Sequence, residues 1–288
     1  MSGKEISLTL ALPVYNGANH ICHSLDSIFK QSFKNFKLII YVNKSQDKTL
    51  SICKKYKKKY KNKIKIFKHN KFVSGYKNLI SVLKKVETKY VLLCSHDDIF
   101  KEKKYIERLV KKLSDNIVPF GKINVIDNQN NILTHISNNN VYNFSEVQLI
   151  RRLKFFFTPS LSGKNCIYYG IQEKKNFLKI LLNKKIKYLD PTISDNYINY
   201  MNLKNKKAVH VKGVTLMKRI KNHEKKILTF GSKKNKIKAV LLNLKSQLNY
   251  IYFSNFLETI VILIMFPINL FYERSILFFF NKVNNKVK

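Results

Sequence analysis

The feature that most constrains the fold is a regular alternation of short apolar runs and amphipathic segments over the first 115 residues. In the segments between the runs, apolar residues recur at helical spacing. In the first of these segments, Ile21, Leu25 and Ile28 would share one face of a helix. The apolar runs are typical of strands buried on both faces, and they cover residues 6–12, 36–42, 64–67 and 90–94. Strands alternating with helices at this pitch predict an α/β fold, with a mostly parallel sheet and right-handed crossovers.

Polar loops follow three of these expected strands, at residues 13–17, 43–47 and 96–98. The carboxyl ends of parallel strands meet at one edge of a sheet, where open α/β folds bind ligands. The adjacent carboxylates of Asp97 and Asp98 repel each other and need a positive partner, such as a divalent cation on a nucleotide diphosphate. An isolated Asp-Asp pair more often forms a solvated loop or a helix N-cap. The convergence of three loops therefore favours a nucleotide site.

Charge and cysteine content narrow the class of protein. The chain has 55 Lys or Arg against 17 Asp or Glu, a formal net charge of +38. This excess implies a polyanionic partner: nucleic acid, an anionic membrane or phosphorylated substrates. Tyr interleaves with Lys at 54–65, as in some nucleic-acid-binding segments, but the position between two strands favours an ordinary crossover helix. The cysteines form no Cys-x-x-Cys pair, which indicates reduced, structural thiols at Cys22, Cys53, Cys94 and Cys166.

Several of these segments resemble motifs of the family 2 glycosyltransferases, which have the GT-A fold. The resemblance begins at residues 12–17 and continues through the Ser-Ile-x-x-Gln-Ser-Phe pattern within 25–33. Residues 45–49 fit the family's Ser-x-Asp-x-Thr, and residues 96–98 fit its metal-binding motif in the His-Asp-Asp form of one subgroup. The resemblance covers about the first two thirds of the chain. It implies a nucleotide-sugar-binding half at 1–115 and an acceptor-binding, catalytic half at 116–230.

The resemblance implies roles for individual residues. Asp98 would hold Mn²⁺ or Mg²⁺ on the donor diphosphate, and Asp97 would face the ribose or sugar. His96 is expected to shape the turn, because imidazole is a poor magnesium ligand. Arg219 and His223 loosely match a segment that closes over the donor phosphates, although a solvated basic loop has the same pattern. The complete donor-binding set implied for a UDP-sugar is Pro13, Tyr15, Asn16, Asn43, Asp97, Arg219 and His223.

The chain departs from the family at the end of the second expected strand. Family members usually have an aspartate there that hydrogen-bonds the base, whereas this chain has Val42. Asn43 could substitute, because its amide both donates and accepts. The alternatives are an unusual donor or a weakened site. Ser45 and Asp47 are expected to structure the loop, as such residues do in Asx turns and helix caps.

The second half is expected to contain a β-hairpin and one further strand. Residues 117–126 and 132–136 have strand-like patterns and are separated by a polar turn, which predicts a hairpin. Residues 163–170 resemble the strand that precedes the acceptor-side helix in the family.

An inverting transferase also needs a carboxylate base near the attacking hydroxyl. The family has this residue at the start of a late helix, and Asp195 matches that position. Asp190 is the alternative base, and a plain N-cap at Ser194 or Asp195 is the structural alternative.

The C-terminal segment, residues 231–288, has a different composition. It begins with a helical apolar stripe, and its residues 259–272 carry no charge but contain Pro267. This stretch is shorter than the roughly 20 apolar residues of a spanning helix. We therefore expect an interfacial or re-entrant helical anchor on an anionic membrane, held there by flanking basic residues. The alternative is an apolar hairpin packed on the catalytic domain or on a second subunit.

These expectations combine into one function. The predicted protein is a metal-dependent, inverting hexosyltransferase that transfers a sugar to a glycan or lipid-linked acceptor in surface polysaccharide biosynthesis. It would be cytoplasmic, peripheral on the inner face of the plasma membrane, and would not bind nucleic acid. Because of Val42, the alternative is an inactive GT-A shell that binds nucleic acid or anionic membrane. A nucleotidyltransferase usually has a Gly-rich basic loop after its first strand, which residues 13–19 lack.

Overall fold

The computed structural model describes residues 7–135, 137–138, 140–159, 163–183, 194–220, 250–251, 253–269 and 275. Its larger sheet has five strands in the order β3-β2-β1-β4-β7. The first four strands are parallel, and β7 is antiparallel to β4. Their bounds are Leu8–Val14 (β1), Phe36–Val42 (β2), Ile64–Lys68 (β3), Tyr90–Leu93 (β4) and Ile171–Glu173 (β7). The predicted mostly parallel α/β sheet is confirmed.

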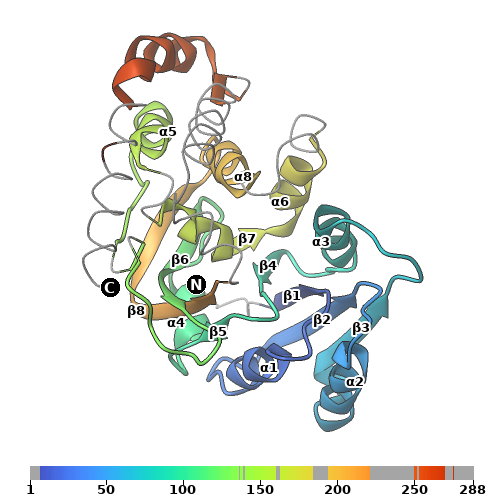
Figure 1. Cartoon of the computed structure of the whole chain (residues 1–288). Helices are drawn as coiled ribbons and strands as arrows, with labels where there is room; N and C mark the ends of the chain where they lie inside the picture. Colours follow the sequence, from blue (N-terminus) through green and yellow to red (C-terminus); the bar gives the residue numbers. More distant parts are fainter. Residues whose placement is uncertain are drawn as a thin grey trace, which may run out of the picture.

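Helices cover both faces of this sheet, with α1 and α2 on one side and α3 with α6 on the other (Figure 1). The three apolar side chains predicted to share one face of α1 are buried: Ile21, Leu25 and Ile28. The bounds are Ile21–Phe29 (α1), Thr49–Lys59 (α2), Lys61–Lys63 (η1), Gly75–Lys84 (α3) and Lys174–Leu181 (α6). The lysines of α2 are exposed while Cys53 is buried, as expected of a crossover helix.

A second sheet of three strands, in the order β5-β8-β6, packs beside the first. Its strands are Ile99–Phe100 (β5), Lys207–Arg219 (β8) and Ile117–Ile126 (β6), and α4 (Tyr105–Lys111) packs against it. β5 pairs with β8 so that Ile99 faces Met217. Because β5 directly follows the Asp97-Asp98 pair, this register brings the end of β8 to the acidic loop.

Helices complete the second half of the described chain. They are α5 (Gln148–Phe157), the 3₁₀ helix η3 (Lys164–Tyr169) and α8 (Ser194–Asn202). A further helix covers residues 256–269 and lies above α5 in Figure 1. Within the described residues, no helix is both long enough and apolar enough to cross a membrane.

Two local predictions for this half are wrong. The first arm of the expected hairpin is present as β6, with the predicted bounds 117–126. The second arm is not a strand: Ile132 makes an isolated bridge to Ile126, no strand continues through 133–135, and residue 136 lies outside the described residues. The side chain of Asn138 accepts from the Val125 backbone N–H at 2.8 Å, so an amide takes a place that a ladder bond would fill. Residues 164–169 form η3 rather than a strand. The strand that precedes α6 is the next segment, β7, so the resemblance placed this strand too early in the chain.

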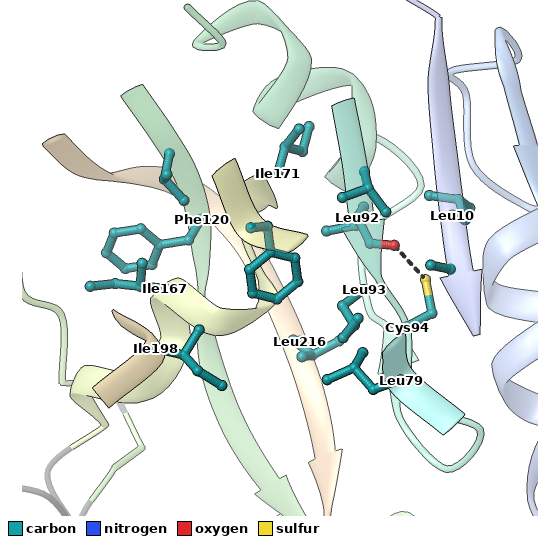
Figure 2. Packing of buried hydrophobic residues seen from close by; sticks show 14 of the residues in the cluster. Leu10, Leu79, Leu92, Leu93, Cys94, Phe120, Ile167, Ile171, Ile198 and Leu216 are labelled. Atoms are coloured by element: carbon teal, nitrogen blue, oxygen red, sulfur yellow. Dashed lines mark hydrogen bonds between the residues drawn. The ribbon is translucent and has the colours of Figure 1, made fainter. Parts of the chain in front are cut away.

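The core is continuous between the two sheets. Figure 2 shows Leu10 of β1 and Leu92 of β4 beside Ile171 of β7, with Phe120 of β6 and Leu216 of β8 on the neighbouring sheet. All of these side chains are buried. The core also includes three of the four cysteines, and all four are free, as predicted. The strand ends that carry the polar loops are therefore fixed by packing on both sides.

A buried ion pair joins the helix at 256–269 to the rest of the protein. Arg152 Nη1 lies 2.6 Å from Glu258 Oε2, and the two side chains are 1% and 0% exposed. The guanidinium of Arg152 stacks on the ring of Tyr200 at 4.0 Å, and the Tyr200 hydroxyl donates to Glu258 at 3.2 Å. The pair connects α5, α8 and the C-terminal helix, so each partner depends on the other for neutralisation.

We expect Glu258→Ala to lower the free energy of unfolding by about 3–5 kcal/mol, because it leaves the Arg152 charge buried and unpaired. Urea denaturation followed by circular dichroism would measure this change. The matched control is Glu87→Ala, which removes an exposed pair with Lys65 at 3.2 Å and should change stability by no more than about 1 kcal/mol. Equal effects for the two variants would show that the Arg152–Glu258 pair does not hold the helix.

Candidate active site

Hydrogen bonds join the loop after β1 to the loop after β2. Asn16 has a left-handed backbone (φ 46°), and its N–H donates to the Ser45 hydroxyl at 3.1 Å. Its side-chain oxygen accepts from the Gln46 N–H at 2.9 Å, and Asp47 accepts from the Ala18 N–H at 2.9 Å. Ser45 and Asp47 therefore structure these loops, as predicted. Asn16 was expected to bind the nucleotide-sugar donor. In the structure its side-chain oxygen is hydrogen-bonded to the loop after β2.

The amide of Asn43 is engaged with the loop that follows β3. Its Nδ2 donates to the Val73 carbonyl at 2.7 Å, and its Oδ1 accepts from the Val73 N–H at 3.1 Å. Asn43 is buried, as is Val42 at the end of β2. The Asn43 amide was expected to replace the family's aspartate and bind the nucleobase. In the structure it fixes the position of the 69–74 loop. Its suggested contact with the base stays a prediction.

That loop brings a second aromatic ring to Tyr15. The rings of Tyr15 and Phe72 are 5.1 Å apart at an interplanar angle of 65°, and they are 39% and 61% exposed. Two exposed rings at the carboxyl edge of the sheet offer an apolar surface to a flat ligand such as a nucleobase. The sequence interpretation missed Phe72. Its only local signal is a phenylalanine in a short, mostly polar loop.

The acidic pair lies directly beyond β4, and both side chains are buried. The Arg219 backbone N–H donates to Asp98 Oδ1 at 3.0 Å, and Arg219 Nε donates to the Asp97 carbonyl at 3.2 Å. Asp98 Oδ2 is buried and has no hydrogen-bond partner among the described residues. Burial, together with the charge of Asp97, raises the pKa of Asp98 to about 7. An ionised carboxylate at this position needs a cation, so the donor set fits a hard metal ion.

Asp97 and His96 face the loop after β1. The Ser95 hydroxyl donates to Asp97 Oδ1, and His96 Nε2 lies 4.0 Å from Asp97 Oδ2. Gly17 packs so closely on the imidazole that an added Cβ would lie 2.6 Å from Cδ2 of His96. His96 thus fills the space between the loops after β1 and β4. Any side chain at position 17 would push these loops apart.

Asp195 lies in the first turn of α8, and its Oδ1 accepts from the Asn196 N–H at 2.9 Å. Desolvation raises the pKa of its carboxyl, although the nearby charge of Lys218 opposes the shift. Lys218 donates to the Tyr169 hydroxyl at 2.7 Å. Burial alone would lower the pKa of Lys218, but Tyr169, Asp98 and Asp195 together raise it, so the ammonium stays charged. Lys218 therefore lies within electrostatic range of both Asp98 and Asp195 and connects the acidic pair with the candidate base.

The sequence interpretation missed Lys218 and Tyr169. In a chain with 55 basic residues, no local pattern separates one inward lysine from the solvated ones. Pro13 lies half-buried at the end of β1. The guanidinium of Arg219 donates to the Asp127 carbonyl and to Asn130 Oδ1, so it holds the turn after β6 against the acidic loop. The predicted positions His223 and Asp190 lie outside the described residues.

No group of three or more His, Cys, Asp or Glu side chains is placed to hold a metal ion in the part of the chain that the structure describes. A cation at Asp98 would thus take its remaining ligands from donor phosphates and water, which is how Mg²⁺ commonly binds. Taken together, these loops combine an aromatic surface, a carboxylate with an unpartnered oxygen and a second carboxylate beside a lysine. A comparison of the sequence with protein families gives the family of the chain. The model described as glycosyl transferase family 2 matches residues 9–168, more than half of the chain. The chain belongs to glycosyltransferase family 2.

Curated relatives agree with this assignment. The chain is 29% identical over 157 residues to an uncharacterized glycosyltransferase of Rickettsia bellii, covering 51% of this chain and 22% of that protein. It is 31% identical over 106 residues to the glycosyltransferase GlyA of Streptococcus pneumoniae, covering 37% and 15%. It is 34% identical over 97 residues to the minor teichoic acid biosynthesis protein GgaB of Bacillus subtilis, covering 33% and 11%. The matches thus span less than a quarter of the length of these relatives.

Solved structures share the fold. The TarS structure (residues 1–349) from S. aureus, in complex with UDP-GlcNAc, has a TM-score of 0.56 and 17% identity, covering 87% of this chain and 68% of that chain. The mannosyltransferase PcManGT from Pyrobaculum calidifontis, in complex with GDP-Man and Mn²⁺, has a TM-score of 0.55 and 16% identity, covering 86% and 65%. The glycosyltransferase described here therefore has the GT-A fold, as its motifs predict.

Proposed function

We propose that this enzyme transfers a sugar from a UDP-sugar to a glycan or lipid-linked acceptor of a surface polysaccharide, with a divalent metal ion and with inversion. The observation that carries the proposal is the unpartnered, buried Oδ2 of Asp98, which shares its lysine neighbour with Asp195. The donor class is supported by TarS, which was solved with UDP and with UDP-GlcNAc. The acceptor class is supported by the names of GgaA and GgaB, both minor teichoic acid biosynthesis proteins.

The donor would bind across the carboxyl ends of β1, β2 and β4. Tyr15 and Phe72 would pack against the base, because both rings are exposed at this edge. Asp97 would hydrogen-bond the ribose or sugar, next to Asp98. Asp98, with Asp97 beside it, would hold Mn²⁺ or Mg²⁺, and such an ion supplies positive charge to the departing diphosphate. The Lys218 ammonium, kept protonated between carboxylates, adds positive charge on the same side.

Asp195 would act as the general base. As the acceptor oxygen forms its bond to the anomeric carbon, its proton passes to the Asp195 carboxylate. The bond from the anomeric carbon to the diphosphate oxygen breaks, and its electron pair leaves with the nucleoside diphosphate. Attack from the face opposite the leaving group inverts the anomeric centre. The raised pKa of Asp195 suits this role, because a more basic carboxylate accepts the proton more readily.

We expect UDP and UDP-GlcNAc to raise the melting temperature of the protein in the presence of Mn²⁺, and less so in EDTA.

Phe72→Ala should weaken UDP binding about tenfold, because one exposed stacking surface is lost. Phe256→Ala is the control: it truncates another exposed phenylalanine, 80% exposed against 61% for Phe72, on the C-terminal helix and should leave UDP binding unchanged. If neither uridine nor guanosine diphosphates bind with Mn²⁺, the inactive GT-A shell becomes the better reading.

We also propose that the enzyme works in the cytoplasm at the inner face of the plasma membrane, where a lipid-linked acceptor would be presented. The net charge of +38 supports attraction to anionic lipid.

A further inference from the structure

One side of the helix at residues 256–269 is both exposed and wholly apolar. Exposure reaches 80% at Phe256, 69% at Ile264 and 60% at Ile268. We define the tail face as the exposed apolar side chains of this helix: Phe256, Leu257, Ile260, Leu263, Ile264, Pro267 and Ile268. Their spacing of three or four residues puts them on a single side of the helix. A contiguous exposed apolar surface on a folded protein marks an interaction site.

The opposite side of this helix is fixed to the catalytic domain. Ile262 is fully buried, and the Glu258 carboxylate is enclosed by Arg152 and by the Asn255 N–H at 3.0 Å. Glu258 is the only charged residue of the helix, so the tail face carries no charge. The fold thus holds the tail face outward by a specific buried contact.

Two partners could cover the tail face, a lipid bilayer or a second copy of this chain. The length of the helix and the charge of the chain favour the bilayer. Residues 256–269 rise about 20 Å as an α-helix, less than the ~30 Å hydrocarbon core of a bilayer, so the helix can lie in a membrane interface but cannot span it. A second copy would carry the same formal charge of +38, which opposes self-association. Anionic lipid is attracted by that charge. Lysines also flank the helix on both sides in the sequence, at Lys233, Lys234, Lys236, Lys238, Lys245, Lys282, Lys286 and Lys288.

We propose that the tail face docks the enzyme on an anionic lipid bilayer by inserting its side chains among the headgroups and upper acyl chains. The inference deepens the proposed function, on which it rests for a lipid-linked acceptor. Docking itself does not require catalysis. The exposed apolar side chains of the tail face would contribute through burial in lipid. The lysines that flank the helix in the sequence would contribute through electrostatic attraction.

The experiment uses the full chain and vesicles of 70% phosphatidylcholine and 30% phosphatidylglycerol. Co-sedimentation should show binding of the parent protein. The double variant Leu257→Ser with Ile264→Ser should lower the partition coefficient by roughly 30-fold, because it removes apolar surface without changing charge. The matched control makes the same kind of change at exposed apolar positions elsewhere, Ile132→Ser with Leu182→Ser, at 54% and 52% exposure. It should bind vesicles like the parent protein.

Three results would overturn the proposal. Equal vesicle binding by the two double variants would mean that the tail face does not contact lipid. A parent dimer that the tail-face variant converts to a monomer, seen by analytical ultracentrifugation, would assign the face to a second copy. A parent protein that neither binds vesicles nor dimerises would mean that other parts of this chain cover the face. UDP binding in the same samples separates these results from a failure of the proposed transferase function.

Discussion

Asp98→Asn is expected to lower kcat/KM for sugar transfer at least about a thousandfold and to abolish the Mn²⁺ dependence of UDP binding. The variant keeps the size of the side chain and one oxygen but removes the negative charge that would hold the cation. The developing charge on the diphosphate then lacks its main neutralising partner. Isothermal titration of UDP with and without Mn²⁺, together with a transfer assay, measures both effects.

The same substitution should not unfold the protein. The pKa of Asp98 is raised to about 7 in the folded state, so its ionisation is less favourable there than in the unfolded chain. Above pH 7 this difference costs stability, and a neutral amide removes the cost. We therefore expect the melting temperature in EDTA to be unchanged or higher. Asp115→Asn is the matched control, because Asp115 lies at the exposed salt bridge with Lys89. A variant at Asp98 that binds UDP and Mn²⁺ like the parent protein would remove Asp98 from the metal site.

Asp195→Asn is expected to lower kcat by about 10²- to 10⁴-fold while UDP binding with Mn²⁺ stays at the parent level. The amide keeps the shape of the side chain but cannot accept the proton of the acceptor hydroxyl. Asp195→Glu retains a carboxylate and should recover part of the lost rate. Measured turnover of the Asn variant at the parent rate would reject this assignment, and Asp190 would then be the next candidate.

The pH dependence gives a second measure of the same residue. Only the ionised carboxylate of Asp195 can accept a proton. Activity measured at saturating Mn²⁺, which keeps Asp98 ionised, should therefore fall as the pH drops through the pKa of Asp195. Because burial raises that pKa, the acidic limb of kcat/KM should lie above the ordinary aspartate value of 3.8. Lys218→Met should move the limb to still higher pH, because the lysine charge favours the ionised form.

Much of the fold could be predicted from local sequence pattern. The alternation of apolar runs with amphipathic segments predicted the parallel strands and crossover helices, because period and burial are set by neighbouring residues in sequence. The same pattern placed Asp97 and Asp98 beyond β4, and the resemblance to the family placed Asp195 at the start of a helix, where the structure has them. The strand that the resemblance implied at residues 163–170 is wrong, because residues 164–169 form η3 and the strand before α6 is β7.

The sequence by itself determined the class of fold, the family motifs and the residues that end each central strand. Only the tertiary structure decided which other side chains those residues contact. Packing brings Phe72 to Tyr15, puts Lys218 in range of Asp98 and Asp195, and engages Asn43 with Val73. It also determined which side of the 256–269 helix faces outward, through a pair 106 residues apart in sequence. Such contacts depend on sheet register and helix packing between distant segments, which no local period encodes.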